Sequence, residues 1–233
     1  MEAKVALVTA ASKGMGAAIA RELASRGWKV GLLARSEAVI RLAEELGGLG
    51  VQGSVTEPAD LGRLVDRTLD RFGRIDGVVV NTGHPAKGDL LALTDEDWQA
   101  GLELLLMPTV RLARLAAPVM ARQGGGAFLN LTSAAALEPN LAFPISSALR
   151  ASVAAYTRLF ARRHAAENLR MNSLMPGFVD SHPASPEVLA SIPQGRLGTV
   201  EEVAQVAAFL LSDEAAYLNG INLPFDGALS RGL

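Results

Sequence analysis

Short apolar runs rich in β-branched residues alternate along the chain with longer stretches whose apolar residues recur every three or four positions. The first pattern predicts buried strands, and the second predicts helices that pack on one side. Strands are predicted at 4–10, 29–34, 49–54, 75–80, 127–132, 170–174 and around Leu223. Helices are predicted at 14–27, 37–46, 58–72, 95–122, 144–167 and from Thr199 onward, where Glu202 completes a capping-box pattern.

This alternation predicts an α/β fold, a doubly wound and mostly parallel sheet of about seven strands with helices on both faces, because parallel neighbours need crossover helices. Pro108 predicts a kink inside the long helix at 95–122. No linker or low-complexity tract interrupts residues 1–233, so a single domain is expected.

Residues 178–197 form a long loop, and loops of that length are usually functional. Its apolar residues are expected either to form a lid over this end of the sheet or simply to pack: Phe178, Val179, Val188, Leu189 and Ile192.

The composition excludes several classes of protein. A chain of 233 residues that is 49% hydrophobic buries a core, and a net charge of -2 gives no field that attracts nucleic acid. The absence of cysteine excludes disulfides and thiolate chemistry, and three scattered histidines favour no metal site. No apolar run reaches the roughly 18 residues of a membrane span, and no leader peptide is evident at the start. We expect a cytoplasmic protein with a small-molecule partner, without nucleic acid or membrane.

A glycine-rich turn follows the first predicted strand and begins the first predicted helix. At such a turn the free backbone N–H groups of a helix N-terminus can bind the diphosphate of a dinucleotide, and glycine allows the close approach. The alternative is purely structural, because turns between strands and helices often contain glycine. The residues concerned are Thr9, Ser12, Lys13, Gly14, Met15 and Gly16.

Several motifs resemble those of the short-chain dehydrogenase/reductase family. The turn is similar to its Thr-Gly-x-x-x-Gly-x-Gly, with Ala10 in place of the first glycine, and 80–83 is similar to its Asn-Asn-Ala-Gly. Residues 172–177 resemble its Asn-x-x-x-Pro-Gly, and 226–227 its C-terminal signature. The resemblance implies a Rossmann domain and hydride transfer between a nicotinamide dinucleotide and a carbonyl or alcohol substrate. It also assigns further residues to the cofactor: Val55, Asn81, Gly83, Pro176, Gly177 and Val179.

The end of the second strand favours NADP over NAD. NAD-binding proteins have an acidic residue there for the ribose 2′-OH, whereas a basic residue suits a 2′-phosphate. This chain has Arg35 and Ser36, and Lys13 is at the family's second basic position. The alternative is that these are ordinary solvated surface charges. Ser54 is in the place of the family's adenine-binding Asp.

The catalytic pair of the family is absent. Ser133 matches the serine that holds the substrate oxygen, but the positions of the proton-donating tyrosine and its lysine hold Ser146 and Arg150. No Tyr-x-x-x-Lys pair occurs anywhere in the chain, and no lysine occurs after Lys87. The family's active-site Asn, located by its distance from Trp98, is replaced by Leu105.

These replacements leave two hypotheses. One is an NADP-dependent oxidoreductase with weak or altered catalysis, in which Ser146, a water or His84 supplies the proton, because a serine hydroxyl is a far weaker acid than a phenol. The other is a catalytically impaired NADP-binding sensor or scaffold. His182 is a lesser candidate donor, and His164 is expected on a solvated helix face. The apolar surfaces of the two long helices favour a homotetramer or homodimer.

Overall fold

A computed structural model describes residues 2–232. Seven parallel strands form one sheet in the order β3-β2-β1-β4-β5-β6-β7, as in the doubly wound sheet predicted from sequence. The strands are β1 (Val5–Thr9), β2 (Lys29–Ala34), β3 (Leu49–Gln52), β4 (Gly77–Val80), β5 (Gly126–Leu131), β6 (Leu169–Pro176) and β7 (Asn222–Phe225).

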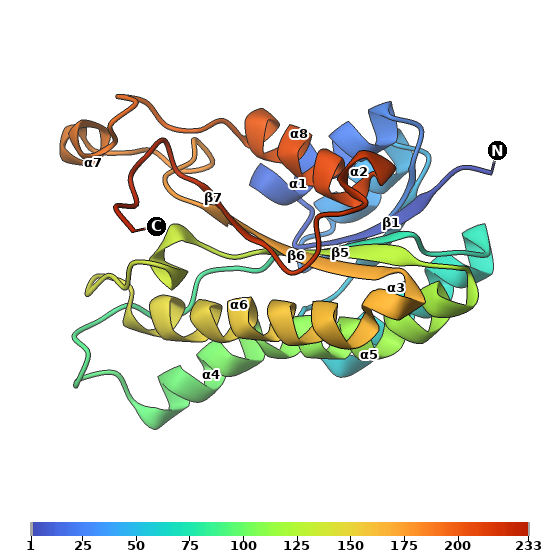
Figure 1. The fold of residues 1–233 in the computed structure, drawn as a ribbon, viewed down its shortest axis with the longest axis horizontal. Helices are drawn as coiled ribbons and strands as arrows, with labels where there is room; N and C mark the ends of the chain where they lie inside the picture. The colour runs from blue at the N-terminus through green and yellow to red at the C-terminus, as the bar shows by residue number, and fades with distance from the viewer. Residues whose placement is uncertain (1, 233) are drawn as a thin grey trace.

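Helices cover both faces of this sheet (Figure 1). One face carries α1 (Gly14–Ser25), α2 (Ala38–Glu45) and α8 (Val200–Leu211). The other carries α3 (Pro58–Phe72), α4 (Asp95–Leu105), α5 (Met107–Arg122) and α6 (Pro144–His164). Each face encloses its own apolar layer, so the central strands are buried on both sides, as parallel sheets require.

The predicted helix at 95–122 is interrupted rather than merely kinked. Helix α4 ends at Leu105 and α5 begins at Met107, with Pro108 in the first turn of α5. Proline lacks an N–H and is tolerated in a first turn, so the break precedes Pro108 instead of falling on it. Pro118 lies inside α5 and was not anticipated as a second irregularity.

Residues 95–122 are also long and apolar enough to cross a membrane by length and composition alone, which the sequence analysis did not anticipate. Of their most apolar window, 44% is buried within the protein. The buried residues of α5 belong to the layer between that helix and the sheet. Core packing therefore accounts for this composition.

The loop at 178–197 contains a short helix that the sequence analysis missed, α7 (Pro186–Ser191). Ser185 caps it by accepting a hydrogen bond from the Val188 N–H. Val179 and Ile192 are buried, so these two apolar residues pack within the protein. Predicted boundaries elsewhere shift by a few residues; β6, for example, runs from Leu169 to Pro176 rather than over 170–174.

The loops that follow the strands gather at one edge of the sheet, at the left of Figure 1, together with α7. The strand order changes direction between β1 and β4, because β2 and β3 lie on one side and β4 to β7 on the other. In open α/β sheets, ligands bind at the carboxyl ends of strands beside such a switch point. The candidate site residues lie at this edge.

Candidate active site

The turn between β1 and α1 leaves a helix N-terminus without a side-chain partner. Helix α1 begins at Gly14, Lys13 provides no capping hydrogen bond, and no acidic residue lies in its first turn. The first N–H groups of a helix have no partner within the helix and carry a partial positive charge. This N-terminus therefore fits the diphosphate of a dinucleotide.

Thr9 fixes the turn to the neighbouring strand. Its hydroxyl donates to the Asn81 carbonyl at 2.7 Å and accepts from the Asn81 N–H at 3.0 Å. The Asn81 side chain in turn donates to the Ala10 carbonyl at 3.4 Å. Thr9 and Asn81, which were predicted to bind the cofactor, thus also hold the ends of β1 and β4 together.

The backbone of the turn has the shape of a glycine-rich dinucleotide loop even where glycine is missing. Ala10 adopts a φ of 47° and Gly14 a φ of 55°, both in the left-handed region that favours glycine. A Cβ on Gly16 would lie 2.5 Å from the Ala10 carbonyl oxygen, so a side chain there would clash with the backbone. Glycine is therefore required at position 16.

The three residues predicted to select NADP lie at the ends of β1 and β2. Lys13, Arg35 and Ser36 are exposed, and neither cation forms an ion pair within residues 2–232. Val55, also assigned to the cofactor, is a buried residue of the loop that follows β3. Nearby, the Ser54 N–H donates to the Asp60 carboxylate at 2.7 Å.

The segment after β6 crosses above the glycine-rich turn. The Ser181 side chain lies 3.4 Å from the position of a Cβ on Gly14. A Cβ on Gly177 would lie 2.8 Å from the Asp226 side chain, so the two family motifs that contain these residues pack together. Pro176 ends β6 and Val179 pairs with Gly198 in an isolated bridge, which places both beside this crossing.

Ser133 follows β5 and caps a short helical turn. Its hydroxyl accepts a hydrogen bond from the Ala135 N–H at 3.2 Å. The hydroxyl hydrogen makes no bond among the described residues and is available to a substrate oxygen. This arrangement suits the role that the family resemblance implies for Ser133.

Arg150 joins three segments of the site. From α6 it donates to the Ser146 hydroxyl at 3.1 Å, to the Leu131 carbonyl at the end of β5 at 2.8 Å, and to the Gly83 carbonyl at 3.4 Å. Three of its five N–H donors are thus engaged, which leaves two for a ligand. Burial lowers the pKa of Arg150 to about 10, so it stays cationic at neutral pH.

Leu105, which the sequence analysis assigned to the position of the family's active-site Asn, has a hydrocarbon side chain. Leu105 is buried at the end of α4. The neighbouring Leu104 lies 4.0 Å from the position of a Cβ on Gly83, so this helix presents apolar atoms beside the motif that follows β4. Leu105 offers no polar atom for a proton relay.

Two histidines meet above the site, a contact that sequence reasoning did not anticipate. The rings of His84, after β4, and His182, after β6, are 5.4 Å apart in an edge-to-face arrangement. Burial, followed by the charges of Arg150, His182 and Lys87, lowers the pKa of His84 below its usual value. His84 is therefore largely neutral at pH 7.

The other expected features have plain structural explanations. His164 lies on α6 beside Glu167, with 3.1 Å between the ring Nδ1 and the carboxylate, and packs on the Phe160 ring. It is only partly exposed, so the prediction of a fully solvated face was incomplete. No group of three metal-ligating side chains occurs in the part of the chain that the structure describes.

Comparisons with known proteins agree with this architecture. A family model described as enoyl-(acyl carrier protein) reductase matches residues 9–230. A 3-oxoacyl-[acyl-carrier-protein] reductase of Escherichia coli (strain K12) is 33% identical over 238 residues, covering 98% of both chains. The corresponding reductase of Vibrio cholerae is 34% identical over 239 residues, again covering 98% of both.

A solved structure shares the whole fold. L-Sorbose reductase from Gluconobacter frateurii, complexed with NADPH and L-sorbose, superposes with a TM-score of 0.93 at 30% identity, covering 100% of this chain and 98% of its own. The fold and these relatives define an oxidoreductase of the Rossmann type. The chain belongs to the short-chain dehydrogenase/reductase family.

Proposed function

We propose that the protein is an NADP-dependent oxidoreductase that transfers a hydride between NADP(H) and a small carbonyl or alcohol substrate. The observation that carries this proposal is the set of bonds made by Arg150, which tie the motif after β4, the end of β5 and Ser146 into one site. The names of the relatives also describe reductases, of 3-oxoacyl groups and of L-sorbose.

The residues present fit NADP(H). The uncapped N-terminus of α1 binds the diphosphate, and Lys13, Arg35 and Ser36 bind the 2′-phosphate. Asn81, Gly83, Pro176, Gly177 and Val179 surround the nicotinamide half, and the two remaining donors of Arg150 bind its ribose. When bound, NADPH supplies the hydride for reduction.

Ser133 and Ser146 hold the substrate oxygen between them. The Ser146 hydroxyl accepts from Arg150, which leaves its hydrogen free to donate. The adjacent guanidinium stabilises negative charge on Ser146, but a serine remains a far weaker acid than tyrosine. Ser146, or a water beside it, therefore delivers the proton slowly, and catalysis is weak compared with a Tyr-Lys pair.

Turnover measurements test this function directly. NADPH oxidation is followed with a panel of ketones and aldehydes, and Ser133→Ala is compared with Ser152→Ala, a change of an exposed serine on α6. We expect slow turnover that Ser133→Ala lowers at least tenfold and that Ser152→Ala leaves in place. NADPH binding without turnover of any carbonyl compound would contradict the proposal.

The same site supports a second candidate, an NADP-binding sensor or scaffold without efficient chemistry. The specific observation is the pairing of Ser146 with Arg150, because neither a phenol nor a lysine is present there to relay protons. In either case we propose a single NADP-binding domain that acts in the cytoplasm as a homodimer or homotetramer.

A further inference from the structure

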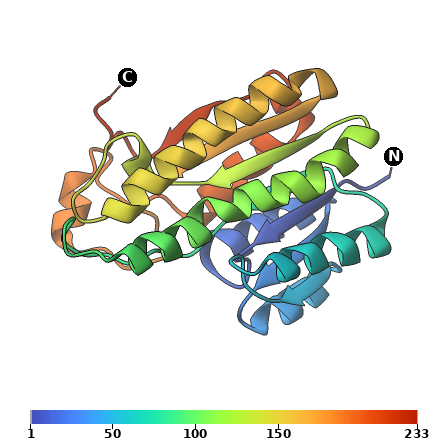
Figure 2. The same ribbon diagram turned by 90° about the horizontal axis from the view of Figure 1, so that it is seen from below.

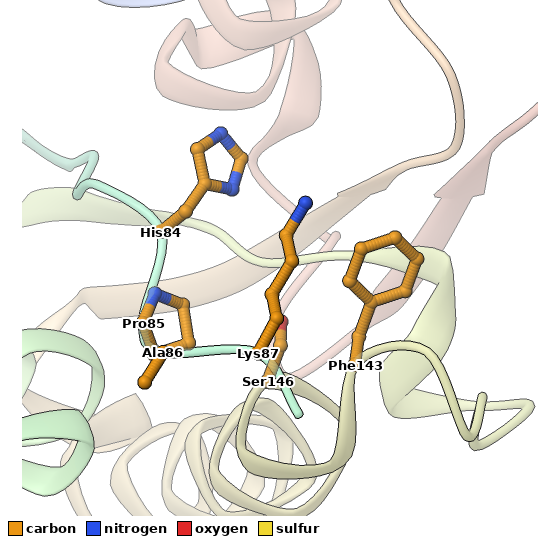
Figure 3. A pocket seen from close by; sticks show the side chains of 6 residues that line it. All are labelled: His84, Pro85, Ala86, Lys87, Phe143 and Ser146. Carbon is orange, nitrogen blue, oxygen red and sulfur yellow. The ribbon is translucent and has the colours of Figure 1, made fainter. Parts of the chain in front are cut away.

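A second group of basic side chains lies around Arg150, and its other members have not been assigned to the cofactor. Lys87, from the segment after β4, extends between the His84 ring and the Phe143 ring, with Ser146 close below (Figure 3). Its ammonium lies 4.8 Å from the centroid of the Phe143 ring. His182 approaches from the segment after β6, and Arg150 lies beneath.

No carboxylate neutralises this group in the part of the chain that the structure describes. Ten ion pairs are formed over residues 2–232, and none of them includes Lys87, His84, His182 or Arg150. Burial is the main cause of the lowered pKa of His84, and the charges of Arg150, His182 and Lys87 lower it further. A cluster of this kind is most stable when an anion binds to it.

The shape of the site limits the anion to a small group. The cavity lined by His84, Pro85, Ala86, Lys87, Phe143 and Ser146 has a volume of about 20 Å³, the space of about one water molecule. A tyrosine ring at position 146 would project toward this space, whereas Ser146 leaves it open. The cavity takes one end of a substrate rather than its body, with Phe143 as an aromatic wall.

We propose that Lys87, with His84 beside it and the positive charge of Arg150 beneath, binds a carboxylate of the substrate, so that the protein reduces an oxo acid or oxidises the corresponding hydroxy acid. The inference rests on the proposed function and specifies its substrate class. In the reduction, the hydride of NADPH forms the new C–H bond, a proton forms the O–H bond and the C=O double bond becomes single. The carbonyl carbon is reduced and NADPH is oxidised to NADP⁺.

Matched substrate pairs test this subsite. We compare kcat/KM for short oxo acids with that for their uncharged amides, in the unmodified protein, in Lys87→Gln and in Lys29→Gln. Lys29 is an exposed lysine at the start of β2, at the opposite edge of the sheet. We expect the acids to be preferred at least tenfold, the preference to fall about tenfold in Lys87→Gln, and Lys29→Gln to retain it. Equal use of acids and amides, or an unchanged preference in Lys87→Gln, would overturn the inference.

Binding measurements separate this inference from the proposed function. Oxamate, an unreactive analogue of an oxo acid, is titrated calorimetrically into the NADP-loaded protein, with oxamide and inorganic phosphate as the comparisons. Oxamate binding that weakens in Lys87→Gln supports the subsite even if no carbonyl compound is turned over. Tighter binding of phosphate than of oxamate, or loss of NADPH affinity in Lys87→Gln, would overturn it, because the cations would then serve a phosphate.

Discussion

Ala10 holds a left-handed backbone conformation, with a φ of 47°, where the family motif has glycine. The Ala10 carbonyl accepts a hydrogen bond from the Asn81 side chain and packs closely against Gly16. Both contacts depend on the direction of this carbonyl, so the turn keeps its shape despite the methyl group of Ala10. An alanine in this region costs about 1 kcal/mol or more relative to glycine.

We therefore expect Ala10→Gly to raise the free energy of unfolding by about 0.5–1 kcal/mol, after the gain in unfolded-chain entropy is subtracted. Urea denaturation measures the change. Ala17→Gly, inside α1, provides a control of opposite sign, because glycine in a helix interior destabilises by about 1 kcal/mol. A loss of stability in Ala10→Gly would show that the turn is not strained at this residue.

Arg35 provides the test of cofactor choice. Its exposed guanidinium at the end of β2 has no carboxylate partner among the described residues. A charge-assisted bond contributes about 1.5–3 kcal/mol, so Arg35→Ala should weaken NADPH binding about tenfold or more and leave NADH binding nearly unchanged. Fluorescence titration of both dinucleotides measures this, with the exposed Arg41→Ala on α2 as control. Equal affinities for the two dinucleotides in the unmodified protein would exclude NADP selectivity.

Ser146 and Arg150, in place of a tyrosine and a lysine, are expected to make catalysis slow. A well-placed general acid contributes about 10²–10⁴-fold to a rate, so Ser146→Tyr with Arg150→Lys should raise slow NADPH-dependent reduction. Ser146→Tyr alone should help less, because an arginine stays protonated and cannot complete the proton path, and because the new ring enters a cavity of only about 20 Å³.

The alternative donor gives the opposite pattern in the same rate assay. If the unmodified protein reduces its substrate quickly, if Ser146→Ala keeps the rate and if His84→Ala abolishes it, the proton comes from His84. The low pKa of His84 argues against this at neutral pH, because little imidazolium is then present to donate a proton.

At the scale of elements, the sequence predicted the strands well and the loops poorly. Strands buried on both faces are usually continuous apolar runs, and such runs are visible in the sequence at β1, β2 and β4. Strand β6 is an exception, because it also buries Arg170, Asn172 and Ser173. Helix α7 was missed even though Ser185 and Pro186 carry the signal of a helix start, because six residues are too few to show periodicity.

Within the candidate site, the sequence predicted the location of residues that belong to motifs better than the location of the others. Ser133 and Gly14, which belong to motifs, lie next to the elements predicted for them, the end of β5 and the start of α1, while their roles stay predictions. The grouping of His84 and Lys87 with Phe143 depends on how two loops fold against each other, which no local pattern encodes. The contact with His182 likewise joins loops that are distant in sequence.

These loops lead to a prediction on pH dependence. The pKa of His84 is lowered by burial and by Arg150, His182 and Lys87, so in the free protein it gains its proton only below its ordinary value of about 6.5. A carboxylate bound beside it favours the protonated ring. Oxamate affinity should therefore rise as the pH falls from 7 to 5, and calorimetry should detect proton uptake on binding.

The control for this pH dependence is chosen from the same chain. His84→Gln should flatten the pH profile of oxamate affinity, whereas His164→Gln, which changes a histidine paired with Glu167 on α6, should keep it. An affinity that is constant between pH 5 and pH 7 in the unmodified protein would show that His84 does not contact the anion.

At the scale of the whole molecule, the net charge of -2 does not by itself favour an anionic ligand, so the placement of individual cations matters. Lys13, Arg35 and Lys87, none of which forms an ion pair within residues 2–232, lie at the edge where the strands end. The resulting field favours an anionic cofactor, and an anionic substrate beside it, at one edge of a nearly neutral protein.

The last prediction concerns subunit association through the outer surface of α5 and α6. The two helices lie side by side on one face of the sheet, as Figure 2 shows, and expose Leu115 and Leu159 to 37% and 67%. Burying such side chains between subunits gains about 1.5–3 kcal/mol each, so we expect a homodimer or homotetramer at micromolar concentration. Leu159→Glu should reduce the mass measured by light scattering, whereas Leu141→Glu, in the loop before α6, should not. A monomer in the unmodified protein would contradict this assembly.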